Sequence, residues 1–111
     1  MGKLHIGQEA KAAIPILIDS LKDREPKVRQ MAVWALGEVA ANADLPVPSL
    51  AAALKDRDVD VRRQAALLLG SLHGGAKPAL LDLKEALKDN ARSVREAAEE
   101  AIAKIEPAKT N

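Results

Sequence analysis

The chain has 111 residues, of which 48% are apolar but only 1% are aromatic, and its 17 basic and 16 acidic residues leave a net charge of +1. This composition is typical of one folded helical domain, and the absence of cysteine excludes disulfides and thiolate metal sites. No apolar run reaches the roughly 18 residues of a membrane span, and the near-neutral charge disfavours nucleic acid or an anionic membrane as partner. The first residues lack the apolar core of a secretory signal, so we expect a cytoplasmic protein.

The sequence repeats itself with a period of 33 residues. A fixed period of this length marks an architecture in which each repeat is one supersecondary element. Six columns stay in register without gaps, among them Leu21-Lys22-Asp23, Leu54-Lys55-Asp56 and Leu87-Lys88-Asp89, and Val28-Arg29, Val61-Arg62 and Val94-Arg95.

Each repeat contains two amphipathic helical patterns joined by a short polar stretch. In the first pattern, Ile14, Leu17, Ile18 and Leu21 recur at the spacing of one buried helix face. The connections are so short that the two helices of a repeat must be antiparallel neighbours. The expected helices are residues 11–22 and 26–41, 46–55 and 59–73, and 78–88 and 92–106.

Prolines and glycines mark several of these boundaries. Pro26, Pro46 and Pro78 lie near expected helix starts, where the missing N–H is not needed. Gly74-Gly75 is expected to close the helix before it, and His73 to interact with the open carbonyls at that end.

A single hairpin cannot bury its own apolar face, whereas three stacked hairpins form a continuous core. We therefore predict an all-α fold, a right-handed α-solenoid of three helical hairpins. Charge increases toward the last repeat, where Glu99 replaces Val33 and Ala66, as in a polar cap. The expected divisions are 1–10, a remnant of an upstream repeat or an N-terminal extension; 11–42, 43–75 and 76–106, the three repeats; and 107–111, a flexible tail.

The N-terminal end carries no such cap. Residues 4–10 are similar to the closing turn of an upstream repeat, since Ile6 lies 33 positions before Val39. Two interpretations follow: the chain is the C-terminal piece of a longer solenoid, or the apolar N-terminal end self-associates.

Residues 27–39, Lys-Val-Arg-Gln-Met-Ala-Val-Trp-Ala-Leu-Gly-Glu-Val, and their counterparts at 61–70 and 94–102 resemble HEAT repeats. The similarity is to the short bacterial variety called PBS-lyase HEAT-like, and it covers about nine-tenths of the chain. It implies a structural ladder in which aspartates and arginines of adjacent repeats pair. The residues of this ladder are Asp23, Arg29, Asp56, Arg62, Asp89 and Arg95.

No set of residues in the sequence has the composition of a catalytic site. The serines have no companion base, and His5 is expected to be a solvated terminal residue rather than a metal ligand. HEAT-like hydroxylases bind iron through His-Glu dipeptides, and HEAT-like DNA glycosylases have a basic, aromatic-rich surface; this chain has neither feature. We therefore expect no enzyme, no cofactor and no metal.

The only aromatic residue, Trp34, lies about 140° from the centre of its helix's buried face. It is either packed between repeats or an anchor for a partner. We predict a non-enzymatic scaffold that binds a protein or peptide on the concave surface of the second helices. The alternative is a lyase-like or accessory subunit acting on a tetrapyrrole or protein substrate. The predicted contact residues are Gln30, Val33, Trp34, Glu38, Arg63, Leu67, Ser71 and Glu96.

Overall fold

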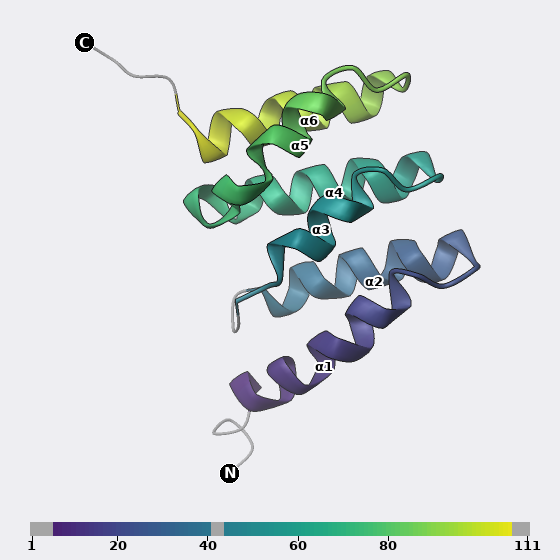
Figure 1. Ribbon diagram of the computed structural model, residues 1–111. Coiled ribbons are helices and arrows are strands. Elements are labelled where there is room, and N and C mark those ends of the chain that lie inside the picture. The colour runs from purple at the N-terminus through teal and green to yellow at the C-terminus, as the bar shows by residue number, and fades with distance from the viewer. Residues whose placement is uncertain (1–5, 41–43, 108–111) are drawn as a thin grey trace. The chain divides into compact units, whose positions relative to one another are not determined.

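The computed structural model describes residues 6–40 and 44–107 of the chain (Figure 1). Every regular element in these ranges is a helix, which confirms the all-α prediction. The chain forms two compact units, Met1–Pro46 and Val47–Asn111, called unit 1 and unit 2 below. Within the two described ranges, no helix combines the length and the apolar character needed to cross a membrane.

Unit 1 contains α1 (Ile6–Ser20) and α2 (Pro26–Val39), which pack against each other. Pro26 is the first residue of α2, as expected for a proline at a helix start. The chain reverses between the helices through backbone bonds such as that from the N–H of Asp23 to the carbonyl of Ser20, at 3.1 Å. Unit 1 is therefore one helical hairpin.

The first helix begins five residues earlier than the predicted Lys11. It starts at Ile6 and continues without a break through Pro15, so residues 6–10 belong to α1 rather than to a separate element. The residues between Gln8 and Ala13 are mostly strong helix formers. They extend the helix toward the N-terminus, beyond the expected range of residues 11–22. The expectations for His5, for a helix end at Ala41 and for residues 108–111 lie outside the described residues.

Unit 2 contains two helical hairpins. The first consists of α3 (Val47–Ala53) and α4 (Val59–Ser71), and the second of α5 (Leu80–Ala86) and α6 (Arg92–Ile105). A 3-10 helix, η2 (His73–Ala79), joins the hairpins and contacts all four helices. The second helices α2, α4 and α6 begin 33 residues apart, as do α3 and α5.

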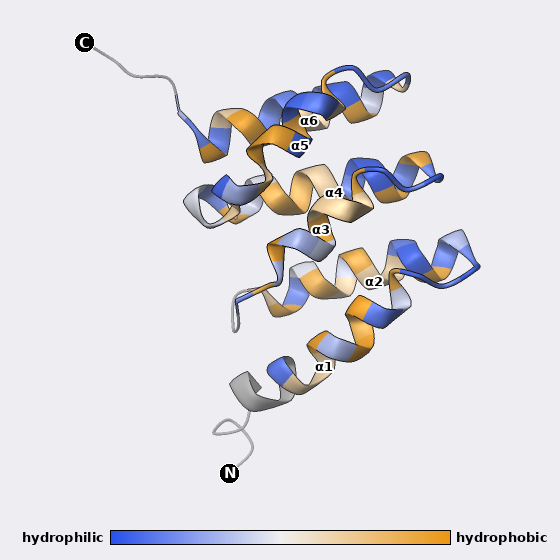
Figure 2. Cartoon of the chain, in the orientation of Figure 1, coloured by the Kyte–Doolittle hydropathy of each residue, from blue (hydrophilic) through white to orange (hydrophobic). Residues whose placement is uncertain are grey.

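The core of unit 2 is built from leucine, valine and alanine. Leu50, Leu69 and Leu83 are its largest fully buried side chains, with Val61 and Val94 at the starts of the second helices. The turns are hydrophilic, whereas apolar residues gather along α3 and the middle of α4 (Figure 2). Small residues let helices approach closely: a Cβ added to Gly70 on α4 would lie 2.8 Å from the Cα of Ala101 on α6.

The segment between α4 and α5 differs from the prediction. Pro78 lies inside η2 and does not start α5, and Gly74 and Gly75 lie in η2 and have negative φ angles. The left-handed residue after α4 is His73, with a φ of 50°. Ala76 and Ala79 of η2 are fully buried, which explains why this segment is held against its neighbours as a 3-10 turn rather than left as an open loop.

Candidate functional site

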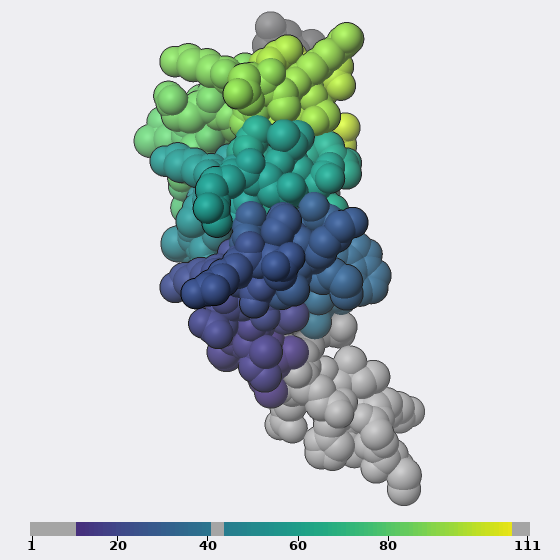
Figure 3. Space-filling view, turned by 90° about the vertical axis from the view of Figure 1, so that its right-hand side faces the viewer, coloured from purple at the N-terminus to yellow at the C-terminus, as the bar shows by residue number. Residues whose placement is uncertain are grey.

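Of the predicted ladder residues, Arg62 and Asp89 form a close pair in unit 2. Nε of Arg62 donates to Oδ2 of Asp89 at 2.8 Å, and Nη2 donates to Oδ1 at 3.2 Å. Arg62 belongs to α4 and Asp89 to the turn before α6, so the pair joins one hairpin to the next. The turns that precede α4 and α6 lie at one end of unit 2, and that end faces the viewer in Figure 3.

Each arginine of the ladder also closes its own turn. Nη1 of Arg29, Arg62 and Arg95 donates to the carbonyl of the residue six positions earlier, and the distance is 2.7 Å in all three turns. The aspartates accept bonds within the turns as well, for example from the N–H of Ala91 to Oδ1 of Asp89 at 2.9 Å. These contacts stabilise the turns, and they leave the arginine side chains largely covered.

The environment of Asp89 shifts its acidity. Burial by itself would raise the pKa of this carboxyl, but the hydrogen bonds from Arg62 and from the N–H of Ala91, with the charges of Arg62 and Arg95, hold the pKa below its ordinary value. The carboxylate is therefore the stable form in the folded chain. It stabilises the contact between the two turns.

The predicted contact residues of unit 1 divide into exposed and buried ones. The side chain of Trp34 is 63% exposed, Glu38 is exposed and Gln30 is half-buried. Val33 is only 2% exposed, so this residue is part of the core and its assignment to a binding surface is corrected. A helical wheel of α2 alone cannot show this, because burial depends on the elements that pack against the helix.

In unit 2 the predicted contact residues lie on α4 and α6, which pack side by side. Arg63 is 4.0 Å from Asp60, Leu67 is half-buried, and the hydroxyl of Ser71 donates to the carbonyl of Leu68 at 2.6 Å. Glu96 accepts a bond from Arg92 at 3.0 Å. These residues therefore offer charged and polar groups, with Leu67 as the partly accessible apolar residue among them.

Met31 is an exposed residue of α2 that the prediction missed. Its side chain is 65% exposed and lies one turn before Trp34. The equivalent positions in the other repeats are Gln64 and Ala97, and Ala97 is only 5% exposed, so the repeat pattern contains no signal for the exposure of Met31. Together, Met31 and Trp34 form an apolar patch on α2.

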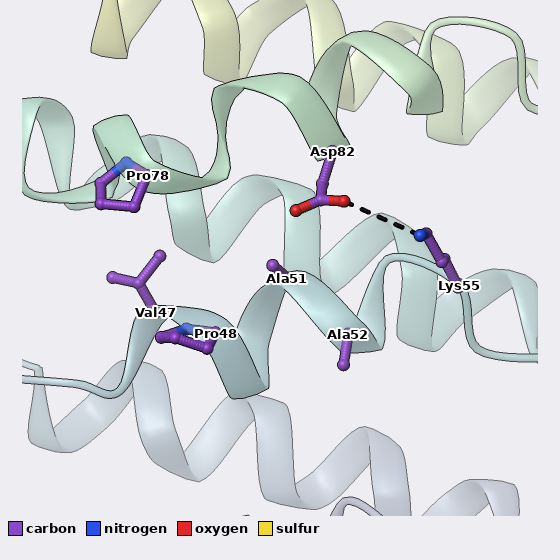
Figure 4. Close-up of a pocket in the computed structure, with 7 residues that line it drawn as sticks. All are labelled: Val47, Pro48, Ala51, Ala52, Lys55, Pro78 and Asp82. Carbon is purple, nitrogen blue, oxygen red and sulfur yellow. Dashed lines mark ion pairs between the residues drawn. The ribbon is translucent and has the colours of Figure 1, made fainter.

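A shallow groove lies on the other side of unit 2, between α3 and the segment η2–α5 (Figure 4). Its volume is about 300 Å³, and the ion pair between Lys55 and Asp82, at 3.8 Å, lies at one end. Small apolar residues form the floor and leave no deep cavity. The lining residues are Val47, Pro48, Ala51, Ala52, Lys55, Pro78 and Asp82.

The described part of the chain brings together no group of three or more histidine, aspartate or glutamate side chains that could hold a metal ion. His73, which lies in this part, is exposed. The polar groups of the Arg–Asp turns make close contacts, and their partners are protein atoms.

A comparison with protein families finds a match to the model of HEAT repeats over residues 14–103. This span contains all three Arg–Asp turns, the exposed face of α2 and both hairpins of unit 2 as far as residue 103. A comparison with curated proteins finds no match.

Proposed function

Because the chain belongs to the HEAT repeat family, we propose that it is a non-enzymatic scaffold that binds a protein or peptide through its second helices. HEAT repeats generally mediate protein–protein interactions. The proposal includes a right-handed solenoid of the short bacterial variety, in which the second helices line the concave surface. A helix or an extended peptide is the partner that such a surface would fit.

The exposure of Trp34 is the observation that carries this proposal. Tryptophan is the side chain most often found at the energetic centre of protein interfaces, because it buries a large area with few rotatable bonds. Trp34 is 63% exposed although it is the only aromatic residue of the chain. Met31 beside it adds a second adaptable apolar contact.

The charged residues of unit 2 support the same proposal. Arg63 on α4 and Glu96 and Glu100 on α6 are accessible and of opposite sign. Exposed charges of this kind add little affinity but select partners with a complementary charge pattern. The ladder residues are engaged in turns, so we assign them to stability and not to binding.

The experiment is affinity capture of partners from the native host, followed by calorimetry with the purified partner. Trp34→Ala should weaken binding by at least about tenfold, as expected for an anchor residue. The matched control is Ile16→Ala, since Ile16 is 69% exposed and lies on α1 of the same unit. Ile16→Ala should leave binding unchanged.

Two results would overturn the proposal. One is a partner whose affinity is the same for Trp34→Ala and wild type. The other is an equal loss in Trp34→Ala and Ile16→Ala, which would indicate non-specific adhesion of exposed apolar residues rather than a binding surface.

A further inference from the structure

Four exposed residues lie along one face of α2: Lys27, Met31, Trp34 and Glu38, called the α2 stripe below. Their spacing of four, three and four positions places them within about 60° of one another on a helix with 100° per residue. The helix has 14 residues and is about 21 Å long. The stripe therefore runs along most of its length, with a basic residue at one end, an acidic residue at the other and two apolar residues between.

One position of the stripe, that of Met31, corresponds to a position that packs against another helix in unit 2. On α6, Val94 and Ala97 are buried (0% and 5% exposed), and they lie on the same side as Ala101, which approaches Gly70 of α4 closely. The equivalent residues on α2 are Val28 and Met31, which are 38% and 65% exposed. Two positions that are buried on α6, one of them in the α2 stripe, are thus open on α2.

The order of residues in the α2 stripe is self-complementary. When two copies of a helix pack antiparallel about a two-fold axis, residues equally distant from the midpoint face each other. The midpoint of the stripe lies between residues 32 and 33, so Lys27 of one copy faces Glu38 of the other, and Met31 faces Trp34. A parallel arrangement would instead place lysine against lysine and glutamate against glutamate.

We propose that the α2 stripe binds the same stripe of a second copy of this chain, as an antiparallel pair of α2 helices about a two-fold axis. The central contacts are between the Met31 thioether and the Trp34 ring, a favourable sulfur–aromatic pair. The flanking contacts are two symmetric Lys27–Glu38 ion pairs. The inference rests on the proposed function, because it names the partner of the α2 part of the binding surface.

The test uses charge reversal in the full chain. Lys27→Glu and Glu38→Lys each create two like-charged pairs in a homodimer, so each variant alone should dimerise at least about tenfold more weakly than wild type. An equimolar mixture restores both ion pairs in a heterodimer, and its affinity should return to within about threefold of wild type. Sedimentation equilibrium over a wide concentration range measures the dimerisation of wild type, of each single variant and of their mixture.

Two further measurements complete the test. Lys11→Glu and Asp19→Lys make the same charge changes at exposed positions on α1, and they should leave dimerisation unchanged. Trp34 is the only tryptophan, so its fluorescence should shift to shorter wavelength and become less accessible to quenchers as the concentration rises.

A wild-type chain that stays monomeric at the highest concentration would overturn the inference, as would single variants that dimerise like wild type or a mixture that does not recover. These outcomes leave the proposed function separately testable. A monomer whose captured partner is lost in Trp34→Ala would show that the α2 stripe binds another protein. A monomer without such a partner would remove both proposals.

Discussion

Arg62 and Asp89, which are 27 positions apart, make a two-point contact, with Nε to Oδ2 at 2.8 Å and Nη2 to Oδ1 at 3.2 Å. The same guanidinium donates through Nη1 to the carbonyl of Asp56 at 2.7 Å. One side chain therefore joins the turn after α3 to the turn after α5. Both members of the pair are nearly buried, with side chains 12% and 11% exposed.

Arg62→Ala should lower the free energy of unfolding by about 2–4 kcal/mol, because it leaves the Asp89 carboxylate desolvated without its partner. Urea denaturation of wild type and variant measures the change. Arg92→Ala is the control: Arg92 is 3.0 Å from Glu96, but these side chains are 83% and 62% exposed. Arg92→Ala should lower the free energy of unfolding by less than about 0.5 kcal/mol. An equal decrease in the two variants would contradict the prediction.

The lowered pKa of Asp89 predicts a pH dependence. A carboxyl whose pKa is lower in the folded than in the unfolded chain stabilises the fold above the unfolded value, and this contribution is lost as the pH falls through the folded value. We therefore expect Asp89→Asn to be less stable than wild type at neutral pH, and this difference to shrink on acidification below about pH 4. Urea titrations at several pH values measure the difference, and a constant difference would contradict the prediction.

Gly70→Ala should destabilise the chain by about 1–2 kcal/mol, even though alanine is the better helix former. The added Cβ would lie 2.8 Å from the Cα of Ala101 and 3.0 Å from its Cβ, so α4 and α6 would have to move apart. Thermal unfolding measures the effect. Gly74→Ala has open space around the new methyl group and should be neutral or slightly stabilising, so a similar loss there would argue against a packing cause.

His73→Gly should raise the free energy of unfolding by about 0.5–1 kcal/mol. His73 has a φ of 50°, a left-handed conformation that glycine adopts without the steric conflict of a Cβ. His73→Ala keeps the Cβ and should not give this gain. Both variants lack the imidazole, and only His73→Gly also lacks the Cβ. The difference between their free energies of unfolding, measured by chemical denaturation, is therefore the backbone effect.

Trp34→Ala should change the free energy of unfolding by less than about 0.5 kcal/mol, because the ring is mostly in solvent. Differential scanning calorimetry at a concentration where the chain is monomeric measures this. Val33→Ala is the contrasting variant: Val33 is buried, and its truncation should cost about 1–3 kcal/mol. A large loss in Trp34→Ala would place the ring in the core.

Much of the helical framework could be predicted from local pattern. The second helices begin at Pro26, Val59 and Arg92, as the step of 33 residues and the proline at a first turn had indicated. The pairing of Arg62 with Asp89 was implied by the resemblance to HEAT repeats, and the two residues do meet. The helix starts depend on residues close in sequence. The Arg62–Asp89 pair depends on a turn whose sequence recurs in each repeat.

The turn at His73 and the η2 segment could not be predicted in the same way. Two adjacent glycines indicate a helix end, yet the left-handed residue is the histidine before them. Ala76 and Ala79 are buried at the centre of unit 2, and contacts with α3, α4, α5 and α6 hold the segment in its 3-10 conformation. Local propensity contains no information about such contacts.

The sequence by itself determined the order of the helices, the starts of the second helices and the apolar face of each, because hydrophobic periodicity acts within a single element. Tertiary structure alone decided which of those apolar residues reach solvent. Met31 and Ala97 occupy the same position of the repeat, and the first is 65% exposed while the second is 5% exposed. The difference arises because the exposure of a residue depends on the segments that pack against its helix, as α4 packs against α6. The sequence pattern of one helix does not show which segments these are.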